Sequence, residues 1–119
     1  MKEVLKNRTK AFAVQIVKMA DGLPHKQIGW TITNQIVRSA TSVAANYRAV
    51  CRAKSDKDFI SKMGTVIEEA DETLFWLELI VELELIPKNE IELLMNENNE
   101  LISIFVASVK TIKKRLSDG

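Results

Sequence analysis

Basic side chains recur on one face of the stretch 34–54, and they are the residues whose chemistry the sequence displays most clearly. Arg38, Arg48 and Arg52 share one face of a helix at about 100° per residue, and Lys54 follows just beyond them. A guanidinium group binds phosphates and carboxylates through paired hydrogen bonds. These side chains therefore predict either contacts to nucleic-acid phosphates or ion pairs with carboxylates.

Carboxylates that could meet the arginines cluster further along the chain, and Glu69 and Glu72 are the two best placed on a helix face. They fit Arg38 either within one chain or across a subunit boundary, and the sequence leaves both alternatives open. Aromatic residues are sparse on the arginine face, so stacking of nucleic-acid bases is not indicated.

A small polar stripe separates the arginine face from the apolar face of the same segment. Its members are Gln35, Ser39, Ser42 and Asn46. Small residues let helices approach closely, and a buried amide must find hydrogen-bond partners. We expect a structural hydrogen-bond network that fixes helix register, rather than a catalytic site.

Residues that could support catalysis are few and scattered. His25 is the only histidine and stands beside a turn, while Cys51 stands next to an apolar face with no histidine near it in sequence. The pair Glu69 and Glu72 lacks the histidines of a four-helix di-iron site, and no Gly-rich phosphate loop is present. We predict no enzyme activity, metal, cofactor or small-molecule substrate.

The elements that must position these residues are helices. Apolar residues recur every three or four positions over 3–21, 27–52, 56–86 and 89–117. The breaks between the segments are short, which favours antiparallel neighbours. The sequence predicts one domain over 1–119, an all-α, antiparallel up-down-up-down four-helix bundle.

The third segment has more apolar residues than a bundle core requires. Besides its core stripe it carries a second set, which we expect on roughly the opposite side: Trp76, Leu79, Ile80 and Leu83. A helix that is apolar on two sides must be covered on two sides. Either a loop or the first helix covers Trp76, or these residues form a homo-oligomer interface that continues through Glu69 and Glu72. We predict the homo-oligomer.

Charge and composition set further bounds. The net charge is +1, yet residues 1–62 carry +8 and residues 63–119 carry −7. Such segregation means that the halves neutralise each other or that a basic face serves an anionic partner. A single cysteine excludes a disulfide within the chain. The start has no signal-peptide pattern and no stretch reads as a membrane span, so we expect a cytoplasmic protein without membrane contact.

Two stretches resemble a known family. Residues 35–46 resemble the signature Q-I-x-R-A/S-A-x-S-I/V-x-x-N of bacterial four-helix-bundle proteins encoded by intervening sequences in 23S rRNA genes and called ribosomal-protein-like; residues 55–59 match its S-x-K-D/E-F. The family often continues Asn-Ile-Ala-Glu-Gly, where this chain has Asn46-Tyr47-Arg48-Ala49-Val50. Without that glycine we expect a longer second helix, and Arg48 makes the face more basic.

The resemblance implies assembly into a ring, typically a pentamer. A more distant likeness to accessory variability proteins of diversity-generating retroelements implies a basic surface that binds nucleic acid and a reverse transcriptase. Two hypotheses follow. One is a non-enzymatic, RNA-associated binding module that contacts phosphates through Arg38, Arg48, Arg52 and Lys54. The other is a protein-interaction scaffold whose Arg and Glu faces are used in subunit interfaces.

Overall fold

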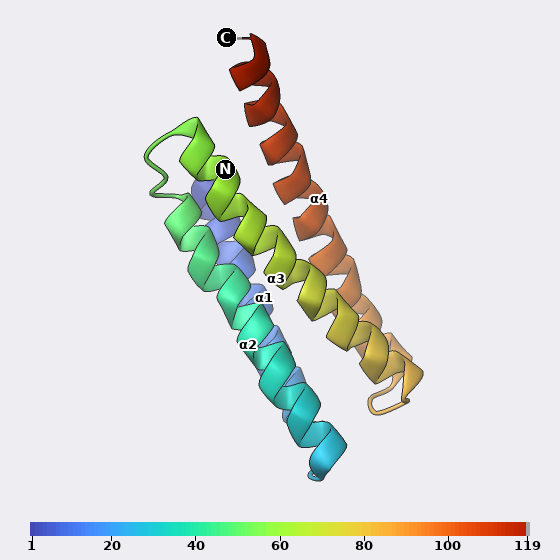
Figure 1. The fold of residues 1–119 in the computed structure, drawn as a ribbon. Helices are drawn as coiled ribbons and strands as arrows, with labels where there is room; N and C mark the ends of the chain where they lie inside the picture. Colours follow the sequence, from blue (N-terminus) through green and yellow to red (C-terminus); the bar gives the residue numbers. More distant parts are fainter. Residues whose placement is uncertain (119) are drawn as a thin grey trace.

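The structure is a computed structural model that describes residues 1–118. These residues form four long α-helices joined by short turns. The helices are α1 (Lys2–Ala20), α2 (Gln27–Val50), α3 (Asp56–Glu82) and α4 (Lys88–Asp118). Each helix runs antiparallel to the one before it (Figure 1), which fits the predicted up-down-up-down order. The all-α fold is confirmed. The helix α2 ends at Val50, the position where the family often has a glycine, so it does not extend to residue 52 as the sequence predicts.

Packing between neighbouring helices gives an elongated molecule of 53 × 22 × 20 Å. The helix α2 packs against both α1 and α3, α3 packs against α4, and a smaller contact joins α1 to α4. An ion pair reinforces that smaller contact, because Arg8 lies 2.6 Å from a carboxylate oxygen of Glu97 and 3.3 Å from one of Glu100. The long α4 extends past the other helices at the C-terminal end (Figure 1).

The core is built from the apolar stripes that the sequence predicts. Ile32, Ile36 and Val43 of α2 and Met63 and Val66 of α3 are fully or almost fully buried. Burial of such side chains stabilises the fold by roughly 1.5–3 kcal/mol each. The stripes therefore hold the four helices together.

Two aromatic rings complete the core near the start of α1. Tyr47 and Phe105 stack with ring centroids 5.8 Å apart and join α2 to α4. Burial, with a smaller contribution from Cys51, raises the pKa of Tyr47 to about 12. The phenol is therefore neutral at physiological pH.

One expectation about α3 is wrong. Ile80 was expected on the outer side with Trp76, but it is fully buried in the core. The reason is helical spacing, since Thr73, Leu77 and Ile80 follow one another at intervals of four and three and lie on the same inward face. Ile80 is therefore not available to a partner.

The ends of α3 are fixed by local hydrogen bonds. At its start, Ser55 Oγ accepts from the N–H of Asp58 at 3.0 Å, and a carboxylate oxygen of Asp58 accepts from the N–H of Lys54 at 2.9 Å. The ion pair with Lys62 and this backbone donor lower the pKa of Asp58. At its end, Glu84 adopts a left-handed conformation (φ 55°) and the N–H of Leu85 donates to the carbonyl of Ile80 at 3.1 Å. Ser55 is therefore the N-cap of α3.

The turn between α1 and α2 depends on a close approach of two backbones. A Cβ atom on Gly29 would lie 1.7 Å from the carbonyl oxygen of Pro24. The chain can fold back over the first turn of α2 only because residue 29 has no side chain. By contrast, a Cβ atom on Gly64, in the middle of α3, would meet no described atom within 4 Å apart from its own helix backbone.

This contrast gives a matched pair of substitutions. We expect Gly29→Ala to lower the free energy of unfolding by about 2–3 kcal/mol because the turn must move away from α2. We expect Gly64→Ala to raise it by about 1 kcal/mol, since alanine is the better helix former. Urea denaturation followed by circular dichroism measures both, and equal effects of the two substitutions would contradict the close approach at Pro24.

Candidate nucleic-acid interface

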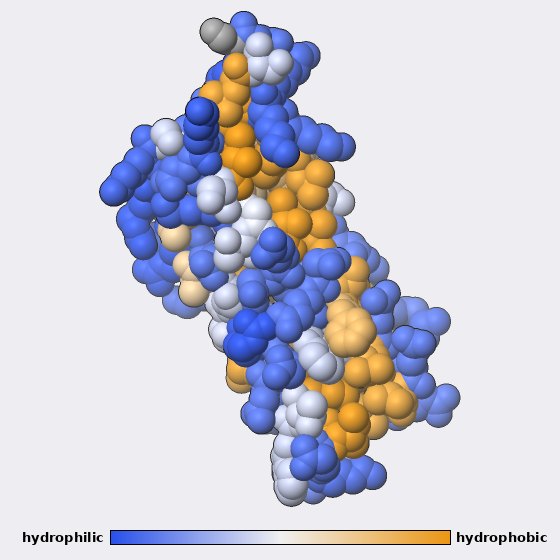
Figure 2. All heavy atoms as spheres, viewed as in Figure 1, coloured by the Kyte–Doolittle hydropathy of each residue, from blue (hydrophilic) through white to orange (hydrophobic). Residues whose placement is uncertain are grey.

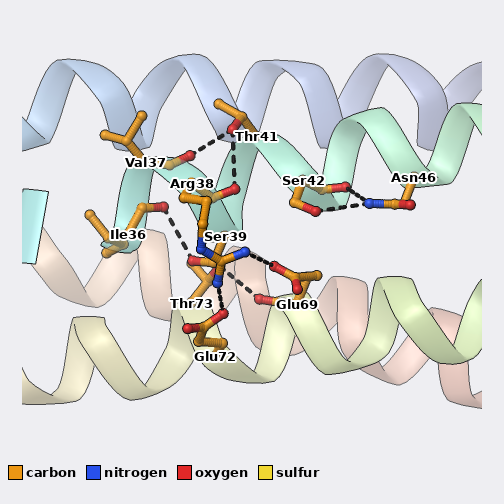
Figure 3. A network of polar contacts seen from close by, with 10 residues as sticks. All are labelled: Ile36, Val37, Arg38, Ser39, Thr41, Ser42, Asn46, Glu69, Glu72 and Thr73. Atoms are coloured by element: carbon orange, nitrogen blue, oxygen red, sulfur yellow. Dashed lines mark hydrogen bonds and ion pairs between the residues drawn. The ribbon is translucent and has the colours of Figure 1, made fainter. Parts of the chain in front are cut away.

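Arg38 is held inside the chain by two glutamates. Its guanidinium donates to Glu69 at 3.0 Å and also to Glu72 (Figure 3). The hydrogen bond to Glu72 is the main cause that raises the pKa of Arg38; desolvation opposes it, and the attraction and hydrogen bond of Glu69 add to the rise. The sequence left open whether Arg38 pairs with glutamates of its own chain or with those of a second chain. In the structure the pairing forms between α2 and α3 of one chain. The guanidinium of Arg38 is therefore paired with carboxylates of its own chain.

Directly beneath this ion pair, two hydroxyl groups join α2 to α3 in the core. Thr73 Oγ1 lies 2.8 Å from Ser39 Oγ and 2.9 Å from the carbonyl of Glu69, and Ser39 Oγ donates to the carbonyl of Ile36 at 3.2 Å. Both residues are fully buried. Thr73 was not among the predicted polar residues, although its position between Ala70 and Leu77 on the apolar stripe is a signal that could have identified it.

The rest of the predicted polar stripe divides into local contacts. Asn46 Nδ2 donates to the carbonyl and to Oγ of Ser42, both at 2.8 Å and both within α2 (Figure 3). Gln35 is half-buried and makes no side-chain hydrogen bond with the residues described. Among the four residues of the stripe, Ser39 is the one that bonds to another helix.

A further buried amide, on α4, makes the corresponding contact to α3. Asn98 is fully buried, and its Nδ2 donates to the carbonyl of Ala70 at 3.0 Å. Its Oδ1 has no hydrogen-bond partner among the residues described. The helices α2 and α4 thus each present a polar side chain to α3 near its midpoint.

Arg48 and Arg52 lie apart from Arg38, in a groove of about 530 Å³ between α1 and α2. We call this the basic groove, and its lining consists of Lys6, Asn7, Lys10, Ala44, Ala45, Arg48 and Arg52. Arg48 and Arg52 are exposed, and within residues 1–118 neither forms an ion pair. Four cationic side chains and no carboxylate therefore line one groove.

Two of these cations come from α1, and the sequence analysis did not select them. Lys6 and Lys10 stand four residues apart, and no acidic residue occurs between Glu3 and Asp21. That spacing was a usable signal, but it needed the knowledge that α1 and α2 are neighbours. Lys54 is exposed in the turn after α2, at the same end of the molecule as Arg52.

The outer side of α3 carries exposed apolar side chains. Phe75 is 51% exposed and Leu83 46%, while Leu79 and Trp76 are half-buried. Phe75 and Trp76 contact edge to face with ring centroids 4.9 Å apart. Figure 2 shows apolar surface gathered over α3 and α4, whereas the surface over α2 in the same view is mostly polar. Phe75, which the sequence analysis did not select, is the most exposed member of the set.

The comparisons with known proteins decide the family. Residues 3–107 match the family described as 23S rRNA-intervening sequence protein. The chain belongs to this family. A solved relative agrees: a protein of unknown function of the S23 ribosomal protein family from Bacteroides thetaiotaomicron is 35% identical, with a TM-score of 0.83 over 89% of this chain and 98% of its own. The resemblance seen in residues 35–46 and 55–59 is thereby confirmed.

Three further searches concern curated relatives, groups of metal-binding side chains and membrane-spanning helices. A search of curated proteins finds no match to the sequence. Within the described range, no three His, Cys, Asp or Glu side chains are grouped so that they could hold a metal ion. None of the helices in that range is both long and apolar enough to cross a membrane. The family relationship therefore establishes the fold. An assignment of function must rest on the geometry of the candidate site.

The Ser39–Thr73 contact yields a double-mutant test. We expect Thr73→Val alone to lower the free energy of unfolding by about 1 kcal/mol, because Ser39 keeps a buried hydroxyl that loses its donor. Ser39→Ala together with Thr73→Val should cost less than the sum of the single substitutions. Urea denaturation of the wild type and three variants gives the coupling energy. Strict additivity would show that the two hydroxyls do not interact.

Proposed function

We propose that this chain is a non-enzymatic, homo-oligomeric helical bundle that binds RNA through phosphate contacts in the basic groove. The observation that carries the proposal is the convergence of Lys6, Lys10, Arg48 and Arg52 on one groove that no carboxylate lines. Lys6 has a distant ion-pair partner in Glu3 at 3.9 Å, whereas Lys10, Arg48 and Arg52 form no ion pair with the residues described. Like charges gathered with so little counter-charge repel one another, and an anionic ligand relieves that repulsion. The family's link to 23S rRNA intervening sequences is consistent with an RNA ligand.

The expected mode of binding follows from the residue types. The groove offers cations and small side chains but no aromatic ring, so it supports backbone contacts without base stacking. Lysine and arginine contacts to phosphates carry no sequence information. We therefore propose binding that depends on RNA shape and salt concentration more than on sequence, with Lys54 extending the basic surface past Arg52.

A protein-interaction scaffold is the second candidate, and the exposed apolar side chains of α3 favour it. From the sequence alone, this hypothesis places the Arg and Glu faces in subunit interfaces. The ion pairs of Arg38 with Glu69 and Glu72 form within one chain and need no neighbour. Self-association through α3 and RNA binding between α1 and α2 use different surfaces, so the two roles are compatible.

Charge reversal in the basic groove tests the RNA proposal. The variant Arg48→Glu with Arg52→Glu should bind a labelled hairpin RNA far more weakly, and the slope of log affinity against log salt should fall by about 2 because two phosphate contacts are lost. Fluorescence anisotropy over a salt series measures both quantities.

The matched control carries the same charge change at the opposite end of the molecule. Lys26→Glu with Lys88→Glu reverses two exposed cations near the α1–α2 and α3–α4 turns. This control should bind the hairpin nearly as the wild type does. Equal losses in both variants would show a general charge effect, and undetectable binding by the wild type at low salt would reject the proposal.

A further inference from the structure

Charge is distributed unevenly along the length of the bundle. One end holds the start of α1, the α2–α3 turn and the C-terminal part of α4 (Figure 1), and we call it the basic end. When each helix is divided at its midpoint, this half comprises residues 1–11, 39–68 and 104–118, which carry 13 Lys/Arg and 5 Asp/Glu, a net charge of +8. The other half, residues 12–38 and 69–103, carries 4 Lys/Arg and 11 Asp/Glu, a net charge of −7. The field of the molecule therefore directs a polyanion to the basic end.

The basic end includes a part of α4 that lies beyond the core. Phe105 is the last buried residue of this helix, which continues to Asp118. We call residues 110–118 the α4 arm, and its side chains are exposed apart from the half-buried Ile112. Figure 2 shows hydrophilic side chains at this tip of the molecule beside a narrow apolar strip. The arm has one carboxylate, at Asp118, and four cations: Lys110, Lys113, Lys114 and Arg115.

Two contacts hold the arm beside the other helices. The guanidinium of Arg115 donates to both carboxylate oxygens of Asp56, at 3.1 and 2.7 Å, which joins the arm to the start of α3. On another side, Thr111 and Ile112 line a mostly apolar pocket of about 280 Å³ together with Lys2 of α1. The arm therefore has a fixed place next to the start of α1.

A row of lysines on α1 connects the arm to the basic groove. Lys2, Lys6 and Lys10 follow one another at intervals of four residues, so they lie along one side of the helix. Lys6 and Lys10 line the basic groove, and Lys2 lines the pocket beside the arm. At 1.5 Å per residue the row spans about 12 Å. The three lysines of the arm form no ion pair with the residues described. One polyanion can therefore contact the groove and the arm at once.

The aromatic residues of the basic end are turned into the core. Tyr47 and Phe105 are buried, and Phe59 is half-buried against the core. Proteins that hold single-stranded RNA stack its bases on accessible aromatic rings, and the described part of the basic end exposes none. Double-stranded RNA keeps its bases stacked on one another and is recognised by its shape and its phosphates. The side chains of the basic end thus suit a duplex better than a single strand.

We propose that the RNA bound by this chain is double-stranded, and that one duplex contacts the basic groove and the α4 arm together. The proposal rests on the RNA-binding part of the proposed function and adds the class of RNA and a second contact surface. A duplex presents two strands of phosphates in a fixed arrangement, which fits two separate cationic surfaces. A single strand must be ordered to reach both surfaces and gains no base stacking in return.

The class of RNA is tested with a duplex of about 16 base pairs and with one of its strands, chosen not to fold on itself. Fluorescence anisotropy at low salt measures the affinity of the wild type for each. The duplex should bind about tenfold more tightly or better, because the single strand finds no stacking partner. Equal affinity for the two RNAs would reject the duplex and leave RNA binding in the basic groove intact.

The arm is tested by charge reversal at two of its lysines. Lys110→Glu with Lys114→Glu changes exposed side chains without ion pairs, so the helix should still form, which circular dichroism checks. This variant should bind the duplex about tenfold more weakly, and the slope of log affinity against log salt should fall by about 2 because two phosphate contacts are lost. The matched control Lys110→Arg with Lys114→Arg keeps both charges and should bind as the wild type does.

Three further outcomes overturn the proposal at different points. An arm variant with the affinity and salt slope of the wild type would remove the arm from the binding surface, whereas the loss expected for Arg48→Glu with Arg52→Glu would still support the basic groove. Cosedimentation of the wild type, but not of the arm variant, with vesicles of phosphatidylcholine and phosphatidylglycerol, with duplex binding equal in both, would assign the arm to a lipid surface. Undetectable binding of either RNA by the wild type would reject the proposed RNA function itself.

Discussion

The close contact between α2 and α3 is the constraint on which the rest of the structure depends. It is apolar over most of its length and is fixed at one point, where Ser39 and Thr73 meet in the core and Arg38 meets Glu69 and Glu72 at the surface above them. A slip of one helix past the other would break the buried hydrogen bond between Thr73 and Ser39, which is the one that joins their hydroxyls across the two helices. This contact sets the register of the two central helices.

That register decides what each arginine of α2 can do. Arg38 is placed over the carboxylates of α3 and is neutralised there. Arg48 lies further along the helix and Arg52 just past its end, and both line the groove against α1 together with lysines and small residues and no carboxylate. Residues of one type on one face therefore have different surroundings, which the neighbouring helices decide: Arg38 pairs with carboxylates inside the bundle, and the other two arginines have no carboxylate partner among the residues described.

The packing of the helices explains where the segregated charge of the sequence lies in the fold. The basic first half forms the α1–α2 layer, and most of the acidic second half lies on α3 and the start of α4. Only part of the opposite charge is paired within the chain, mainly at Arg38, Arg8 and Arg115. The remainder leaves a basic groove and an acidic, partly apolar helix face on opposite parts of one molecule. The proposed RNA site rests on that imbalance.

The sequence by itself determined the helices, their order, the core stripes and the family, because those features depend on local residue spacing and short motifs. It also indicated the arginines and the extra apolar residues of α3. Only the tertiary structure separated Arg38 from Arg48 and Arg52, brought Lys6 and Lys10 beside them, and placed Ile80 in the core and Phe75 outside it. The reason is physical: helical spacing fixes which residues share a face, but which faces meet depends on how the helices pack against one another.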